Sequence, residues 1–252
     1  IYLGLLLLLI AIFMRRSLDE TPIFLELTKK TPKIESQLLN NFRDPQIRKR
    51  MFLLFFCISS SGAILFFCVQ VYTMIFLKTA VRLDSALVDQ LSIGATVILI
   101  PLTVAAGWLS DLFGRKPIVL SGIMLGAILL YPSYEMLEQL GVHYLENPSA
   151  FTFIGISAIL ILLSCMLALV VGPQTALLAE LFPAKNRNSA ATLPHNLAAG
   201  WIGGLLPLIV TWLNQQWGNT MAGLWYPTIF LICAGTVAFL YLPETKQTDL
   251  HH

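Results

Sequence analysis

The feature that most constrains this chain is a series of long stretches that contain no Asp, Glu, Lys or Arg. Six of them are long enough to cross a lipid bilayer, which takes a helix of about 20 residues. They cover residues 51–77, 91–110, 117–134, 151–179, 189–213 and 223–242. Only 12% of all residues are charged, against about 25% in soluble domains, so the composition excludes a water-soluble core. The sequence therefore predicts an all-α membrane protein with six complete spans.

The polar segments divide the chain into four parts. We interpret residues 1–14 as the end of a further, truncated span, and residues 15–50 as a polar loop with short surface helices. Residues 51–243 are expected to form the six-helix membrane domain, and residues 244–252 a polar tail. We interpret His251 and His252 at its end as the remnant of an affinity tag.

The basic residues are distributed unevenly between the two sides of the membrane. Fourteen of the 16 Lys and Arg residues lie in 15–50, in the link near residue 115, in 180–188 and in the tail. Cytoplasmic loops of membrane proteins carry an excess of Lys and Arg. We therefore expect these four segments to lie in the cytoplasm, and the loops 138–150 and 214–222 to lie on the opposite side.

The link between the second and third spans is the shortest, and we call residues 107–116 the hinge. It contains Gly107, Asp111, Gly114, Arg115 and Lys116. The two glycines permit close approach of the helices and a sharp turn. Asp111 can accept hydrogen bonds from a helix N-terminus, where free N–H groups and the helix dipole favour an anion. Arg115 can bind a carboxylate through two parallel hydrogen bonds.

Three further charged residues are candidates for the same network. Glu180 follows the span 151–179 and is the expected partner of Arg115. Arg187 and Glu244 are expected to extend the network on the cytoplasmic side. The alternative is that these residues only determine topology and form exposed ion pairs, each worth about 0–1 kcal/mol.

The last three spans contain no Asp, Glu, Lys or Arg, and His195 is their only histidine. Neutral polar side chains are therefore the main candidates for lining a solute path. The candidate residues are Gln70, Tyr72, Thr73, Gln174, His195 and Asn196. The run Ser59-Ser60-Ser61-Gly62, which softens the first span near its middle, is considered with them. Gln70 and Thr73 are three residues apart and share a helix face. The amides of Gln70 and Gln174 each need a hydrogen-bonding partner in an apolar medium. For every candidate, hydrogen bonding between helices is the alternative to lining a path.

Two pairs of glycines are spaced for close helix packing. Gly122 and Gly126, and likewise Gly200 and Gly204, are four residues apart and are expected to lie on one helix face. Small residues at this spacing let the backbones of membrane helices approach each other.

The sequence lacks the residue patterns that are typical of several other classes of function. The four cysteines lie inside apolar runs without the short spacings of metal sites, so we predict neither disulfides nor a metal site. Basic residues are not interleaved with aromatic ones, which argues against nucleic acid as a partner. The spans contain no convergent nucleophile and acid, so the sequence predicts no enzyme, and no segment indicates a cofactor.

Five stretches, in order along the chain, resemble the major facilitator superfamily. The hinge, G-x-x-x-D-x-x-G-R-K, resembles the loop between the second and third helices of each six-helix half. Residues 15–24, 179–187, 196–207 and 242–245 resemble the end of helix 6, the loop between helices 10 and 11, helix 11 and the end of helix 12. The matching subgroup is that of the metabolite:proton symporters. The resemblance implies the C-terminal half of a twelve-helix fold, helices 7–12, with the end of helix 6 and the central loop.

The resemblance also implies a function. A protein of this kind is a secondary transporter that moves a small polar metabolite (an organic acid, betaine or amino acid) together with a proton by alternating access. The implied partners are this solute, the proton, membrane lipid and an N-terminal six-helix half. Asp111 would dock against that half as part of a cytoplasmic latch. A proton-binding carboxylate would lie in the same half, with His195 as the local alternative, and the implied location is the inner membrane of a bacterium.

Two alternatives stay open. The tail Pro243-Glu244-Thr245 also resembles the end of helix 12 in sugar porters, although Gln247 stands where those proteins usually have Gly. A non-transporting receptor on the same fold would normally carry an extra soluble domain, and the sequence shows no such domain.

Overall fold

The computed structural model describes residue 13 and residues 41–182 and 187–246. Within these ranges every regular element is a helix, which confirms the all-α prediction. The expected truncated span at residues 1–14, the loop before residue 41 and the tag remnant at residues 251–252 lie outside the described residues, apart from residue 13.

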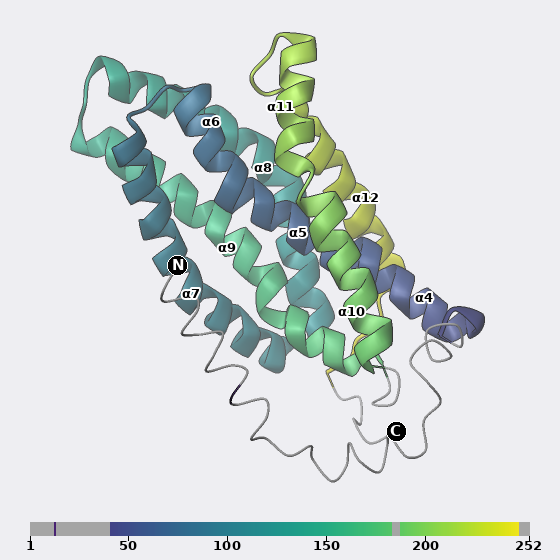
Figure 1. The fold of residues 1–252 in the computed structure, drawn as a ribbon. Helices are drawn as coiled ribbons and strands as arrows, with labels where there is room; N and C mark the ends of the chain where they lie inside the picture. Colours follow the sequence, from purple (N-terminus) through teal and green to yellow (C-terminus); the bar gives the residue numbers. More distant parts are fainter. Residues whose placement is uncertain (1–12, 14–40, 183–186, 247–252) are drawn as a thin grey trace. The chain divides into compact units, whose positions relative to one another are not determined.

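Six helical segments of the described chain are long and apolar enough to cross a membrane, as predicted (Figure 1). The first runs without a break through α4 (Pro45–Leu53), η1 (Leu54–Ser59), α5 (Ser60–Phe66), η2 (Phe67–Tyr72) and α6 (Thr73–Thr79), with η1 and η2 in π-helical conformation. It is followed by α7 (Ser85–Phe113), α8 (Arg115–Glu146) and α9 (Ala150–Glu180). The fifth segment combines α10 (Arg187–Leu197), the π-helical η3 (Ala198–Gly203) and α11 (Leu206–Trp217). The last consists of the short 3-10 helix η4 (Ala222–Leu224) and α12 (Trp225–Tyr241).

Two segments that we expected to be loops are partly helical. The helix α8 continues to Glu146 and α11 to Trp217, so most of 138–150 and the first part of 214–222 extend the spans. The 32 residues of α8 correspond to about 48 Å, whereas a hydrocarbon core is about 30 Å thick. The additional turns keep their backbone hydrogen bonds in the polar region, where the apolar pattern no longer marks them.

Short polar side chains begin three of the helices. Asp44 accepts two backbone N–H groups at the start of α4, and Asp84 does the same at the start of α7. Ser149 and Thr152 cap α9 reciprocally, each hydroxyl accepting from the backbone N–H of the other. These caps satisfy N–H groups that have no partner in the first helical turn.

The spans differ strongly in how much of their surface the rest of the bundle covers. In the most apolar stretch of the first span 72% of the residues are buried, whereas the figure for α7 is 11%. In the fifth span, from residue 190 to 217, 22% of the residues of the most apolar stretch are buried. The first span therefore lies at the centre of the described bundle, and α7 and the fifth span keep broad apolar faces uncovered by it.

The first glycine pair packs as predicted. A Cβ atom placed on Gly122 would lie 2.7 Å from Val170 Cγ2, so α8 and α9 approach closely at this point. A Cβ on Gly126 would lie 2.9 Å from a Leu65 methyl group on the first span. Both positions exclude a larger side chain unless a neighbour moves.

The second glycine pair does not pack as predicted. Gly200 faces open space, with nothing within 4 Å of the position that a Cβ atom would take, whereas a Cβ on Gly203 would lie 2.8 Å from Ala63 Cβ. The reason is the π-helical conformation of η3, which has more residues per turn than an α-helix and so rotates the contact face. The prediction from four-residue spacing is wrong here.

We expect Gly122→Ala to lower the free energy of unfolding by about 1–3 kcal/mol, because the methyl group overpacks the contact with α9. Gly200→Ala is the matched control and should be neutral or slightly stabilising, by up to about 1 kcal/mol. Thermal unfolding in detergent micelles measures both. Equal losses in the two variants would contradict the packing described for Gly122.

Candidate functional site

The hinge contains a one-residue link between two long helices. The helix α7 ends at Phe113 and α8 begins at Arg115, with Gly114 between them at φ +108°. This backbone conformation favours glycine. A Cβ on Gly114 would also lie 2.6 Å from Glu244 Oε2, so the turn and the approach of the tail both require glycine. The predicted sharp turn is confirmed.

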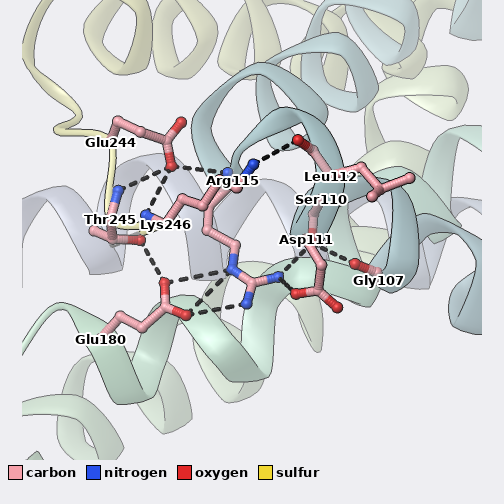
Figure 2. Close-up of polar contacts among 9 residues, drawn as sticks. All are labelled: Gly107, Ser110, Asp111, Leu112, Arg115, Glu180, Glu244, Thr245 and Lys246. Carbon is pink, nitrogen blue, oxygen red and sulfur yellow. Dashed lines mark hydrogen bonds and ion pairs between the residues drawn. The ribbon is translucent and has the colours of Figure 1, made fainter. Parts of the chain in front are cut away.

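The Arg115 side chain connects three elements at the hinge (Figure 2). Its Nε and Nη2 donate to Glu180 Oε1 over 3.2 and 3.1 Å, and its Nη1 donates to Ser110 Oγ over 2.7 Å. Nη1 also forms an ion pair with Asp111, one helical turn earlier. The side chains of Arg115 and Glu180 are only 13% and 14% exposed. The predicted pairing of Arg115 with Glu180 is thus present and is largely shielded from solvent.

The Glu244 carboxylate caps the N-terminus of α8. It accepts the backbone N–H groups of Arg115 and Lys116 over 2.9 and 3.2 Å. It also accepts the N–H groups of Thr245 and Lys246, which follow it in the chain. For Asp111 we predicted a helix N-terminus of the other half as the partner, and this stays a prediction. Within the described residues, Glu244 is the carboxylate that caps the N-terminus of α8.

These contacts determine the direction of the pKa shift of Glu244. Burial alone would raise this pKa, but the backbone N–H groups of Arg115, Lys246, Thr245 and Lys116 together lower it below its ordinary value of 4.5. The folded state therefore favours the ionised carboxylate. Its contribution to stability is complete above the ordinary value and is lost as the pH falls through the lowered value.

The segment after α12 is fastened to the hinge by two more side chains. Thr245 Oγ1 donates to Glu180 Oε2 over 2.7 Å, and Lys246 Nζ donates to the carbonyl of Leu112 over 2.5 Å (Figure 2). We call Ser110, Asp111, Arg115, Glu180, Glu244, Thr245 and Lys246 the hinge cluster. The sequence analysis did not assign Ser110, Thr245 or Lys246 to this network. Their hydroxyl and ammonium groups form hydrogen bonds that no residue spacing in the sequence marks.

Lys116 and Gly107, the other candidates in the hinge, contact neighbouring helices. Lys116 Nζ donates to the Phe239 carbonyl over 2.9 Å, near the C-terminus of α12. Gly107 on α7 lies against Gly172 on α9. A Cβ atom placed on Gly172 would lie only 2.9 Å from the backbone nitrogen of Gly107. Arg187 begins α10, but its side chain lies outside the described residues.

A second polar group lies within the bundle, where three helical segments meet. His195 Nδ1 lies 3.4 Å from Gln174 Nε2 and 3.2 Å from Ser59 Oγ. These residues come from α10, α9 and η1, and we call them the inner polar cluster. Gly62 on α5 leaves room for the Gln174 amide, since a Cβ there would lie 3.2 Å from Gln174 Oε1. Gln174 and His195 were named as candidates for the solute path, and Ser59 belongs to the serine run that was considered with them.

The other path candidates are separated rather than gathered. Gln70 Oε1 accepts from Thr96 on α7 over 2.9 Å, and Gln70 Nε2 has no partner among the described residues. The Thr73 hydroxyl lies 2.8 Å from Tyr134 OH on α8 and is buried. Gln70 and Thr73 therefore contact different helices, despite the shared face that we expected.

Tyr72 and Asn196 lie elsewhere on the bundle. Tyr72 OH accepts from Asn214 Nδ2 over 2.9 Å, and its ring packs against Tyr134. Asn196 is exposed in the described bundle, beside His195 in the chain. In the part of the chain that the structure describes, no three His, Cys, Asp or Glu residues are grouped as a metal site would need.

Comparison with known proteins places this geometry in context. The sequence profile described as "Sugar (and other) transporter" matches residues 14–252. The chain is 27% identical over 256 residues to the ectoine/proline transporter ProP of Corynebacterium glutamicum, covering 96% of this chain and 47% of that protein. It is 26% identical to the inner membrane metabolite transport protein YhjE of Escherichia coli, over 97% of this chain and 53% of that protein.

A further relative is the citrate-proton symporter of Klebsiella pneumoniae, which is 27% identical over 188 residues. That alignment covers 73% of this chain and 39% of the symporter. The chain thus spans about half the length of the curated relatives that it matches over most of its own length.

We expect Glu244→Ala to destabilise the protein by about 1 kcal/mol at pH 7, because α8 loses an anionic cap. The loss should shrink as the pH falls below the ordinary value of 4.5, where the wild-type carboxylate becomes protonated as well. Thermal unfolding at a series of pH values measures this difference. Glu135→Ala, at an exposed glutamate on the same helix, is the control. A loss at Glu244 that stays constant into strongly acidic solution would contradict the capping role.

Proposed function

Because this chain belongs to the sugar (and other) transporter family of the major facilitator superfamily, we propose that it forms half of a secondary transporter for a small polar metabolite. The family is one of membrane transporters and not of enzymes. The proposed solute is an organic acid, a betaine or an amino acid. It moves by alternating access together with a proton, through a site between two six-helix halves.

The proposed partner is an N-terminal six-helix half. Two observations support it: the chain spans about half of its relatives, and α7 and the fifth span keep apolar faces uncovered. The proposed orientation puts the hinge cluster in the cytoplasm, on the strength of the excess of Lys and Arg at that side. The proposed location is the bacterial inner membrane.

The hinge cluster is the proposed cytoplasmic latch, and the observation that carries this role is the contrast between its two acidic partners. Glu180 is 14% exposed and bonded within the bundle, whereas Asp111 is 59% exposed although it pairs with the same Arg115. Asp111 therefore keeps oxygen lone pairs available to N–H groups of a helix end on the other half. Arg187 is proposed to join this latch.

The inner polar cluster is the proposed solute site of this half. Ser59, Gln174 and His195 come from three segments and present a hydroxyl, an amide and an imidazole, which can donate to and accept from a polar solute. The exposed side chain of Asn196 is proposed to face the other half from the same level. Gln70, Tyr72 and Thr73 are proposed to support the path through their contacts with neighbouring helices.

Proton coupling is proposed to depend on the other half. The first span carries no Asp, Glu, Lys or Arg from residue 51 to 77, and α7 carries none from 91 to 110. A proton-binding carboxylate of this half would have to lie in such a span. His195 is the local alternative as the proton carrier, since one imidazole nitrogen can accept a proton while the other donates one.

The names of the relatives support the solute class. They include transporters for ectoine and proline, for proline and betaine, and a symporter for citrate and protons. A sugar porter is the first alternative, and a non-transporting receptor on the same fold is the second.

The proposal predicts solute accumulation that depends on a pH gradient. Proteoliposomes that contain the full-length transporter should take up proline, glycine betaine or citrate faster under an imposed gradient than without it.

Gln174→Ala should raise the KM for the transported solute about tenfold, the equivalent of one lost hydrogen bond of about 1.4 kcal/mol. Gln216→Ala, at an exposed amide near the end of α11, is the control. Accumulation of glucose alone would favour the sugar-porter alternative, and no gradient-dependent accumulation would refute proton symport.

The latch predicts that Asp111→Asn shifts the transporter away from its cytoplasm-closed state. A reporter cysteine, Asn196→Cys, should then react with maleimide about three- to fivefold faster from the hinge side, as expected for the loss of an ion pair of about 0.7–1 kcal/mol. Asp89→Asn removes the ion pair with Lys78 at the far end of the bundle and is the matched control. Unchanged reactivity in Asp111→Asn would count against the latch.

A further inference from the structure

A cavity of about 370 Å³ is lined by residues of η2, α6, α11 and the turn after α11. In Figure 1, α6 and α11 lie at the end of the bundle where α7 begins, whereas the hinge follows the other end of α7. We call this cavity the outer cleft. Its lining includes Tyr72, Phe76, Thr79, Thr211, Asn214 and Gln215. A cavity of this volume falls within the range of sites for small molecules, about 300–1,000 Å³. Only Tyr72 among these residues was a candidate of the sequence analysis.

One wall of the outer cleft is fixed by Asn214. Its Nδ2 donates to Tyr72 OH over 2.9 Å and to the Thr220 carbonyl over 2.7 Å. Its Oδ1 accepts the Gly223 N–H over 2.6 Å. The amide is therefore fully engaged in holding the turn after α11 against the first span, which gives the cleft a preformed shape.

Three other side chains of the lining offer groups that can bind a solute. Gln215 follows Asn214, is exposed and has no hydrogen bond within the described residues, so both ends of its amide are available. Thr79 and Thr211 donate to carbonyls of their own helices, over 2.7 and 2.6 Å, and keep acceptor lone pairs. Asn219 and Thr220 are engaged instead, by the Met221 N–H and by Glu138. A solute in the outer cleft would thus meet an amide donor, several acceptors and the partly exposed apolar side chain of Ile75.

The surroundings limit the charge of that solute. The lining contains no Lys or Arg, and the Glu138 carboxylate lies directly behind it, accepting from Thr220 over 3.0 Å. A solute with a net negative charge would lose hydration there without gaining a counter-charge, which is costly. The lining therefore favours a small solute without net negative charge that has hydrogen-bonding groups and an apolar face.

The outer cleft and the inner polar cluster are separate places on the same span. Tyr72 and Ser59 are thirteen residues apart in one continuous helical segment, which corresponds to about 20 Å along its axis. A small metabolite cannot reach both at once. Tyr72 belongs to η2, and its ring packs 5.6 Å from the Tyr134 ring, so the outer cleft is bounded by the core of the bundle.

We propose that the outer cleft is a solute-binding site, which captures a small solute without net negative charge from the face opposite the hinge before it reaches the inner polar cluster. This proposal rests on the proposed transport function and adds a first, separate binding site to it. The lining described here comes from η2, α6, α11 and the turn after α11, so this half contributes that site.

Solute protection of a cysteine tests the site without requiring transport. Gln215→Cys in the full-length protein should react with a membrane-impermeant maleimide, and saturating proline, glycine betaine or glucose should slow that reaction about tenfold. Gln216→Cys, the neighbouring exposed position outside the lining, is the matched control and should not be protected. Citrate, which carries a net negative charge, should protect neither cysteine. Equal protection at both positions, protection of neither, or protection by citrate alone would overturn the proposal.

A kinetic experiment separates the outer cleft from the transport function itself. Thr79→Trp fills the outer cleft from its rim and should raise KM about tenfold for solute added at the face opposite the hinge. The KM for solute added at the hinge side should stay within twofold. The kcat in that reverse direction should fall about tenfold, because a blocked cleft slows entry and release alike and the transport equilibrium fixes the ratio of kcat/KM for the two directions. Thr236→Trp, at an exposed threonine of α12, is the control.

Equal changes of KM from both faces, or none, would overturn the outer cleft while leaving transport intact. Absence of uptake by the wild-type protein would instead refute the proposed function, and the protection of Gln215→Cys would still decide whether the outer cleft binds solute.

Discussion

The guanidinium of Arg115 imposes the strictest local requirement in the described bundle. It is only 13% exposed, and a charge so far removed from water needs both opposite charge and hydrogen-bond acceptors. Glu180 on α9 and Asp111 on α7 supply the charge, and Ser110 adds an acceptor. The requirement of one side chain thus fixes α7, α8 and α9 relative to each other at the hinge.

The tail completes the same arrangement from the other direction. Glu244 binds the backbone of α8 rather than the Arg115 side chain, and Thr245 binds the Glu180 oxygen that faces it. The carboxylates of Glu180 and Glu244 therefore each have several donors, whereas Asp111 pairs, among the described residues, with Arg115 alone. Such multiple bonding makes partly buried carboxylates and guanidinium groups compatible with an apolar surrounding.

The apolar pattern was sufficient to predict six spans and their order, because each crossing must bury a minimum length of apolar helix. The pairing of Arg115 with Glu180 was also predictable, since both groups are charged and lie at the same end of neighbouring spans. The capping by Glu244 was not, because its partners are backbone N–H groups that every sequence has. Ser59 was harder to single out than Gln174, since a serine in an apolar run is equally typical of simple packing.

The π-helical segments account for the errors in register. A π-helical turn adds a residue, and every position after it rotates around the axis. Gly203 replaces Gly200 at the contact with Ala63, and no feature of composition announces this change. Polar side chains accompany these segments: the hydroxyls of Thr73 and Tyr134 both bond to the Cys68 carbonyl in η2.

The single residue between α7 and α8 has a mechanical consequence. Gly114 provides only two backbone torsions, and rotation about either would pull the N–H groups of Arg115 and Lys116 away from Glu244. The end of α7 and the start of α8 are therefore expected to move as one rigid unit. Lys116 connects this unit to α12 through its hydrogen bond to the Phe239 carbonyl. A force applied to the exposed face of α7 would be transmitted to the far side of the bundle without passing through its centre.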